Sequence, residues 1–197
     1  FNEISNDEKL DYLNILNGLS QKTNNLLDDL LLWARIQMNT LEFTIEKINL
    51  ESLISTSIAI VEQKAIEKNI KIETQIDDIN LEINKSSIQT VIRNLLSNAI
   101  KFSNKNSKVL IKSKILSDKK TVKVSVQDNG IGIPKEDVNK LFKIETSFST
   151  YGTEQEKGTG LGLILCKELL EKNGGAIWVK SEDGVGSTFH FTLPLKK

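Results

Sequence analysis

Apolar residues follow a helical spacing through the first part of the chain, up to about Leu41. Ser5 and Glu8 stand where the two members of a capping box at a helix start would stand. A heptad seam follows, polar in places, with members alternately three and four residues apart: Leu13, Leu16, Ser20, Thr23, Leu27, Leu30, Ala34, Gln37 and Leu41. This pattern predicts one long helix, which either packs on the domain that follows or joins a helix bundle. Because a helix of this length cannot bury its own apolar surface, we favour the bundle.

From about Thr44 the pattern changes to short alternating segments mixed with shorter helical ones. Alternation of apolar and polar residues predicts strands at 43–50, 70–76, 81–84, 108–116, 121–128, 176–182 and 187–194. Helical spacing predicts helices at 51–68, 86–102, 134–142 and 161–172. This order of elements predicts an α+β fold: a two-layer sandwich of a mixed, mostly antiparallel sheet with helices on one face, preceded by the long bundle-type helix. The domain boundary falls near Phe43, between 1–43 and 44–197.

Composition narrows the class of protein. Lys plus Arg equals Asp plus Glu at 26 each, and this zero net charge argues against a nucleic-acid or membrane-surface binder. The single cysteine, Cys166, excludes an intrachain disulfide, and on an apolar helix we expect it to be a buried thiol. No apolar run approaches the roughly 18 residues that span a bilayer. The chain has no signal peptide and opens at Phe1 without Met, so we expect a fragment of a longer protein.

Glycines alternate with other residues in EKGTGLGL, residues 156–163, just before an apolar helix. Each glycine costs backbone entropy, so three of them, Gly158, Gly160 and Gly162, need a reason. A mobile loop, a close approach of the backbone to a phosphate, and a plain helix start are all sufficient reasons. This stretch alone leaves the three open.

A second stretch, QDNGIGI at 127–133, ends an apolar strand with a carboxylate. Asn129 and Gly130 predict a sharp turn, and Gly132 allows another backbone to approach closely. Asp128 at the strand end could accept a hydrogen bond from an exocyclic amine such as that of adenine. It could equally cap the turn.

The third stretch is RNLLSNAIKFS, residues 93–103, in which Asn94, Asn98 and Lys101 lie near one face of a helix. Asparagine has poor propensity for a helix interior, so two on one face suggest a polar task. An amide oxygen suits Mg²⁺ that is held mainly by phosphates, and Lys101 adds a positive charge for the same phosphates. The alternative is that both amides bond to neighbouring loops.

Together these stretches occur in the order asparagine helix, DNGIGI, polar loop, GTGLGL. In this order the chain resembles the ATP-binding catalytic domain of sensor histidine kinases of two-component systems, a Bergerat fold within the wider gyrase, heat-shock chaperone and mismatch-repair ATPase superfamily. The resemblance covers roughly residues 44–195, including the closing GGAIWVKSEDGVGSTFHFTLP. It implies ATP and Mg²⁺ as cofactors.

The resemblance also assigns roles to individual residues. It makes Asn98 the Mg²⁺ ligand with Asn94 assisting, and Lys101 a phosphate contact. The remaining nucleotide contacts that it implies are the wall residue Phe102, the adenine reader Asp128 with Gly130, Gly132 and Ile133 around it, Lys157 at the end of an ATP lid at 143–157, and Gly158, Thr159, Gly160, Leu161 and Gly162 at the phosphates. Leu141, Phe142 and Phe148 match the family's phenylalanine box loosely. Alternation along the last strand puts Ser187 on its buried face, from which Ser187 can reach the region of Asp128.

One position separates kinases from ATPases in this superfamily. Gyrase-like ATPases carry a glutamate four residues before the Mg²⁺ asparagine as the general base for water, and here that position is Asn94. A neutral amide cannot take a proton from water at pH 7. We therefore expect ATP binding without efficient hydrolysis, and transfer of the γ-phosphoryl to another group.

The segment NLLDDLLLWARIQMNTLEF, residues 25–43, resembles the second helix of the kinases' dimerisation and phosphoacceptor domain. The family's phosphoacceptor histidine lies on the first helix of that domain. The only histidine here, His190, shares its strand face with Thr188 and Thr192, so we expect an exposed sheet residue and no catalytic residue in this chain. The acceptor is expected upstream of Phe1.

The resemblance implies a response-regulator receiver domain as partner and a homodimer formed through the helical bundle of the full-length protein. It implies a cytoplasmic location, as a free protein or as the cytosolic part of a membrane-anchored sensor. The alternative function is a non-enzymatic nucleotide-binding regulatory module, either a pseudokinase or an anti-regulator. The long helix and the three intact stretches favour the kinase. Asn84, where many relatives have Asp, is expected to cap the asparagine helix.

Overall fold

The computed structural model describes residues 5–117, 120–143, 152–154, 156 and 158–195. Contacts divide the chain into two compact units, Phe1–Leu41 and Glu42–Lys197. None of the helices in the described ranges is both long enough and apolar enough to cross a membrane.

The first unit is the single helix α1 (Asn6–Gln37). Its start is the predicted capping box, which is confirmed: Ser5 Oγ accepts from the Glu8 N–H at 3.2 Å, and the Glu8 carboxylate accepts from the Ser5 N–H at 2.8 Å. The helix ends at Gln37 and not at Leu41, and Asn39 has a positive φ of 54°, which cannot continue a helix. Apolar side chains remain exposed along it, among them Leu13, Leu16, Leu27 and Leu30.

The second unit is built on a five-stranded sheet in the order β2-β4-β5-β7-β6. Its strands are β2 (Lys71–Gln75), β4 (Lys108–Ile115), β5 (Thr121–Asp128), β6 (Ala176–Glu182) and β7 (Gly186–Pro194). Only β2 and β4 are parallel, so the predicted mixed, mostly antiparallel sheet is confirmed. Two further strands, β1 (Glu46–Asn49) and β3 (Asn80–Ile83), pair with each other in a separate antiparallel sheet.

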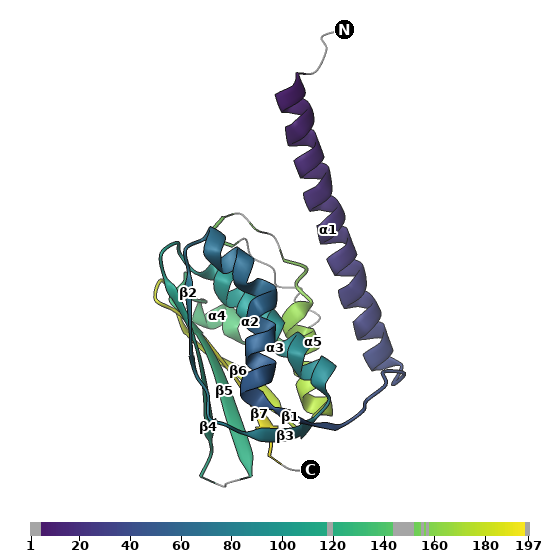
Figure 1. The fold of residues 1–197 in the computed structure, drawn as a ribbon, viewed down its shortest axis with the longest axis vertical. Coiled ribbons are helices and arrows are strands. Elements are labelled where there is room, and N and C mark those ends of the chain that lie inside the picture. The colour runs from purple at the N-terminus through teal and green to yellow at the C-terminus, as the bar shows by residue number, and fades with distance from the viewer. Residues whose placement is uncertain (1–4, 118–119, 144–151, 155, 157, 196–197) are drawn as a thin grey trace. The chain divides into compact units, whose positions relative to one another are not determined.

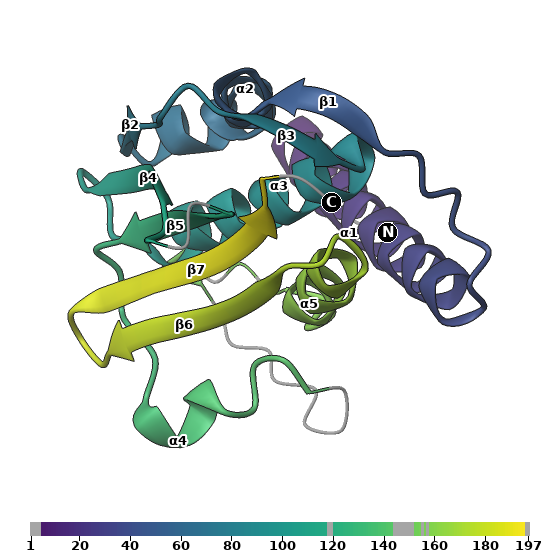
Figure 2. The same cartoon turned by 90° about the horizontal axis from the view of Figure 1, so that it is seen from below.

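Three helices cover one face of this sheet, as Figures 1 and 2 show: α2 (Leu50–Glu67), α3 (Lys85–Phe102) and α5 (Gly162–Lys172). Alternate residues of β5 and β7 point into the core between sheet and helices, namely Val122, Val124, Val126, Phe189, Phe191 and Leu193. Full burial of each such side chain is worth about 1.5–3 kcal/mol, so this face contributes substantially to the stability of the unit. The predicted two-layer sandwich is therefore confirmed.

Two of three predictions made for the helices from local sequence patterns are confirmed, and one is wrong. Asn84 caps α3, with its Oδ1 accepting from the Ser87 N–H at 3.0 Å, as predicted. Cys166 is fully buried on α5, also as predicted. The predicted helix at 134–142 is too long, because α4 is a single turn (Lys135–Val138) followed by turns.

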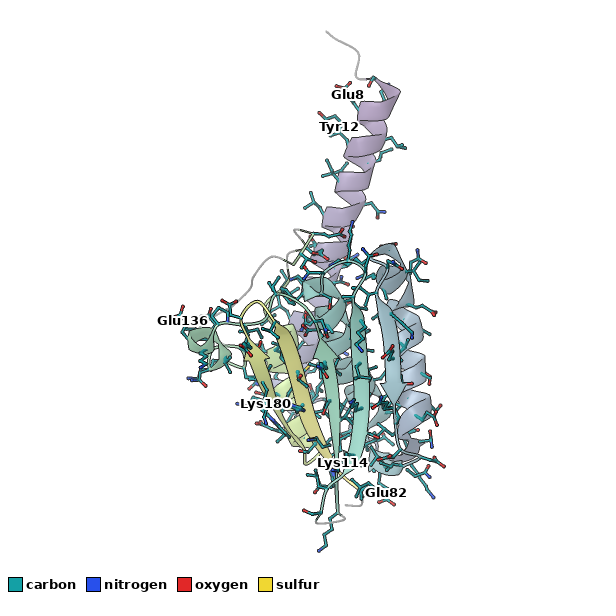
Figure 3. The ribbon with its side chains drawn as sticks, turned by 90° about the vertical axis from the view of Figure 1, so that its left-hand side faces the viewer. Glu8, Tyr12, Glu82, Lys114, Glu136 and Lys180 are labelled. Carbon is teal, nitrogen blue, oxygen red and sulfur yellow. The ribbon has the colours of Figure 1, made fainter. Side chains whose placement is uncertain are left out.

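Among the described elements no helix covers the other face of the sheet, and Figure 3 looks onto this face, with Lys114 and Lys180 labelled. His190 lies on this face, opposite the phenylalanines, but it is half-buried and not exposed as predicted. Its ring stacks on Trp178 of β6, with the ring centroids 5.3 Å apart, and its Nδ1 lies 2.8 Å from Ser125 Oγ of β5. The neighbours that cover it belong to other strands, which its own strand's alternation does not reveal.

Candidate functional site

Asp128 ends β5 as a nearly buried carboxylate, 5% exposed. Its Oδ1 accepts two backbone hydrogen bonds, from the Gly130 N–H at 3.0 Å and from the Ser187 N–H at 3.1 Å. Burial raises the pKa of Asp128 to about 6, against the lowering effect of these two hydrogen bonds. Among the described residues no hydrogen bond to Oδ2 is found, so this oxygen is left as an acceptor for a ligand's N–H group.

The turn after Asp128 fits tightly against two other segments, which explains two of its glycines. A Cβ at Gly130 would overlap the carbonyl of Phe102 at the end of α3, and the Ile131 N–H donates to that same carbonyl at 3.2 Å. Gly132 has a positive φ of 71°, and a Cβ there would overlap the carbonyl of Glu182 at the end of β6. Glycine is thus required at both positions for close approach of backbones.

Asn94 of α3 faces the start of α5. Asn94 Nδ2 is buried and has no hydrogen-bond partner among the described residues, while Asn94 Oδ1 lies 3.4 Å from the place that a Cβ on Gly162 would occupy. A buried amide without a partner is rare in proteins and points to a group from a ligand. Asn98 is half-buried one turn further along α3.

Lys101 lies on the last turn of α3, with its Nζ 4.6 Å from the centroid of the Phe102 ring. Partial burial lowers the pKa of Lys101, Glu156 raises it, and the nearby cation Lys68 lowers it further. The lysine is thus a partly desolvated cation, which binds an anion more strongly than an exposed lysine does.

The N-terminus of α5 is arranged to receive an anion. The helix begins at Gly162, and its N-cap residue, Leu161, provides no side-chain hydrogen bond to the first turn. Gly160 has a positive φ of 78°, a conformation that glycine adopts without strain. Backbone N–H groups and the helix dipole at such an N-terminus favour a phosphate.

These groups fit an adenine nucleotide. Asp128 offers an acceptor at one end, the start of α5 offers donors at the other, and Asn94, Asn98 and Lys101 lie on α3, which contacts both elements. Within the described ranges no cluster of three or more His, Cys, Asp or Glu side chains could hold a metal ion. A metal at this site would need ligands of another kind, such as phosphate oxygens and side-chain amide oxygens.

The structure brings together three pairs of residues that the sequence placed in one site: Asp128 with Gly130, Gly130 with Phe102, and Asn94 with Gly162. All the described candidates are buried or half-buried apart from Thr159, namely Asn94, Asn98, Lys101, Phe102, Asp128, Gly130, Gly132, Ile133, Gly158, Gly160, Leu161, Gly162 and Ser187. Lys157 and Phe148 lie outside the described residues, as does most of the expected lid at 143–157. Their roles remain predictions.

Two features of the site were not foreseen. Ser187 reaches Asp128 through its backbone N–H, while its hydroxyl lies 2.9 Å from that of Ser181. Lys68, at the end of α2, has a side chain that is only 4% exposed and contacts the end of α3. A lysine closing an amphipathic helix usually remains in solvent, so no local pattern identifies it.

Residues 83–197 match a protein family described as histidine kinase-, DNA gyrase B-, and HSP90-like ATPase. The matched span is more than half of the chain and includes α3, β5, α5 and β7, but not Lys68 at the end of α2. The chain belongs to this ATPase family.

Among the relatives of this ATPase domain is the sensor histidine kinase WalK of Bacillus subtilis (strain 168), 32% identical over 188 residues, which are 94% of this chain and 31% of WalK. The chain spans between 10% and 31% of the length of four such curated relatives.

Solved structures agree with this relationship. The nucleotide-free catalytic domain of the histidine kinase ThkA is 34% identical, with a TM-score of 0.66 over 79% of this chain and 97% of that domain. The same kinase in complex with the response regulator protein TrrA is 27% identical, with a TM-score of 0.74 over 98% of this chain and 53% of the kinase.

Proposed function

We propose that this ATPase-family chain is the ATP-binding catalytic part of a two-component sensor histidine kinase. It holds ATP so that the γ-phosphoryl passes to a histidine on an upstream helix and from there to an aspartate of a response regulator. The observation that carries the proposal is the pair formed by Asp128, with its open acceptor oxygen, and the unpartnered amide of Asn94 beneath Gly162.

The proposed binding mode follows from the chemistry of each end of the site. Asp128 Oδ2 accepts from the exocyclic amine of adenine, and the phosphates lie at the N-terminus of α5 near Lys101. Asn98 is the protein ligand of Mg²⁺, with Asn94 assisting. When bound, Mg²⁺ neutralises charge on the transferred phosphoryl group.

Asn94 supports a kinase over an ATPase. Its amide cannot accept a proton from an attacking water, so water is not activated at this position. The relatives named as sensor histidine kinases, and the ThkA structure with its response regulator, support a receiver domain as the downstream partner. The exposed apolar residues of α1 support dimerisation through a helical bundle in the whole protein, and ATP as phosphoryl donor supports a cytoplasmic location.

The test has two arms. ATP and ADP are titrated calorimetrically into this chain and its Asp128→Ala variant, with and without Mg²⁺, and we expect binding that the variant lacks. The chain is then incubated with γ-labelled ATP, alone and as part of a longer chain that contains the upstream helix. We expect label only in the longer chain. Label on His190, rapid ATP turnover by the isolated chain, or equal binding by the variant would contradict the proposal. Nucleotide binding without label in the longer chain would favour the regulatory module.

A further inference from the structure

A buried lysine joins three parts of the second unit that are far apart in sequence. Lys68 caps the end of α2, and its Nζ donates to the carbonyls of Ile100 at 3.1 Å and Lys101 at 3.0 Å, in the last turn of α3. The same Nζ donates to Thr153 Oγ1 at 2.7 Å and to Glu156 Oε1 at 3.0 Å.

These contacts are what an ammonium group needs in order to be buried. Removing a charged group from water is costly unless each of its N–H donors is paired, and here four acceptors surround three donors. Two of the acceptors are carbonyls at the C-terminus of α3, where the helix dipole favours a cation. The fourth is a carboxylate, which gives Lys68 its one formal counter-charge among the described residues.

The segment that carries Thr153 and Glu156 is folded over the last turn of α3. The Thr153 N–H donates to the Lys101 carbonyl at 3.1 Å, and the Thr153 hydroxyl donates to the Ser103 carbonyl at 2.9 Å. The Gly152 N–H donates to the Glu156 carbonyl at 2.9 Å, which ties these two ends of the loop together. The carbonyl of Lys101, the proposed phosphate contact, therefore accepts hydrogen bonds both from this loop and from the end of α2.

We propose that Lys68 is a positioning residue for the nucleotide site: it pins Thr153 and Glu156 onto the last turn of α3. The pinned loop holds Lys101 in place and sets where the glycine stretch at 158–162 begins, two residues after Glu156. Lys68 itself does not touch the nucleotide. The expected effect on nucleotide binding rests on the proposed function. The contacts of Lys68 with Thr153 and Glu156 exist in the chain without nucleotide.

The first arm of the test measures pinning alone. Hydrogen exchange of the backbone N–H groups of Gly152 and Thr153 is followed in the nucleotide-free chain and in Lys68→Met. We expect both groups to exchange at least about tenfold faster in the variant, since their loop loses its anchor, while the amides of β5 and β7 keep their protection. Unchanged exchange at these two positions would overturn the proposal, whether or not the chain binds nucleotide.

The second arm measures the consequence for binding. We expect Lys68→Met to weaken ATP binding by about tenfold and to leave adenosine binding nearly unchanged, because Lys101 and the glycine stretch face the phosphates and not the base. A fall in both affinities by the same factor would show general structural damage and would overturn the positioning role. If wild-type chain binds neither ligand, the proposed function fails while the exchange result still stands.

A mutant cycle and a matched pair complete the design. Glu156→Gln should weaken ATP binding in the same direction, and the double variant should lose little more than Lys68→Met, because both residues act through one contact. Additive losses would overturn this. Glu154, on the same loop, forms an ion pair at 2.6 Å with Lys105, which follows α3. This pair is solvent-exposed, so Lys105→Met and Glu154→Gln should stay within about twofold of wild type. Should Lys68→Met fail to fold, Glu156→Gln serves in both arms.

Discussion

The Asp128 carboxylate accepts a hydrogen bond from the backbone N–H of Ser187 at 3.1 Å, although 59 residues separate them in sequence. This bond ties the end of β5 to the beginning of β7 and fixes one oxygen of the carboxylate. Because the carboxylate cannot rotate freely, its other oxygen keeps a fixed direction and is preorganised for a specific donor. Burial of this ionised carboxylate lowers the free energy of unfolding.

Asp128→Asn is expected to stabilise the folded chain while abolishing nucleotide binding. Because the pKa of Asp128 is raised from 3.8 to about 6 in the folded state, its ionised form is disfavoured there, and the difference corresponds to about 3 kcal/mol above pH 6. The folded protein binds this proton more tightly than the unfolded one, so the cost disappears as the pH falls from about 6 toward 3.8. Asparagine removes the charge and retains an oxygen for the two backbone donors.

Thermal and chemical unfolding at pH 7.5 and pH 4.5 check this. The gain in free energy of unfolding should reach up to about 3 kcal/mol at pH 7.5 and shrink at pH 4.5, where Asp128 is mostly protonated. The control is Asp77→Asn, which removes an exposed carboxylate before β3. An equal gain at both pH values would show that the buried charge is not its cause.

Gly132→Ala is expected to impair the site far more than Gly184→Ala. Both glycines have a positive φ, 71° and 76°, so alanine is strained by a similar amount, about 1 kcal/mol, at each position. Only at Gly132 would the added Cβ also overlap a carbonyl, that of Glu182, whereas nothing lies within 4 Å of a Cβ at Gly184. Gly132→Ala must therefore shift the turn after Asp128.

Nucleotide titration and unfolding of the two variants side by side test this difference. Gly184→Ala should lose about 1 kcal/mol of stability and keep its affinity. Gly132→Ala should lose more stability and at least about tenfold in ATP affinity, since the adenine acceptor is displaced. Equal effects from the two variants would mean that the contact with Glu182 does not restrain the turn.

His190 is expected to titrate below the ordinary range of histidine. Burial lowers the pKa of His190, and the cations Lys123 and Lys180 lower it further. A lowered pKa means that the unfolded chain binds this proton more tightly, so this residue's contribution to stability is complete above pH 6.5 and declines below it.

Because His190 is the only histidine, its imidazole signals in an NMR titration can be assigned without ambiguity. Lys180→Glu should raise the pKa of His190, since a cation is replaced by an anion. Lys47→Glu, on the separate β1–β3 sheet, makes the same change in charge and should leave the titration unaltered. If both variants move it equally, net charge and not the neighbouring lysine determines the pKa.

Asn98→Ala is expected to remove the effect of Mg²⁺ on ATP binding. With the amide ligand gone, the metal is held by phosphates and water alone, so the ATP affinities with and without Mg²⁺ should come within about threefold of each other. Affinity for adenosine should not change. The control is Asn104→Ala, an exposed asparagine just after α3. A variant that still binds ATP more tightly with Mg²⁺, to the extent of wild type, would remove Asn98 from the metal site.

Local patterns anticipated much of the fold because each depends only on near neighbours. Alternation along β7 put Ser187 and Phe191 on the buried face, and the capping signals at Ser5 and Asn84 follow from side chains that reach three residues ahead. The same reasoning failed for His190, whose covering residues Trp178 and Ser125 belong to neighbouring strands. It also overextended α4, since a proline start says little about where a helix ends.

The sequence by itself determined the order of the elements, the core-facing side of β5 and β7, and the three polar stretches that predict a nucleotide site. Only the tertiary structure decided which strands pair, with β1 beside β3 and β2 parallel to β4. It also decided that Lys68 meets Glu156, 88 residues away, and that Asp128 meets the N–H of Ser187. Hydrophobic periodicity reports how a segment faces the core, whereas contacts between distant segments depend on how all of the segments pack together.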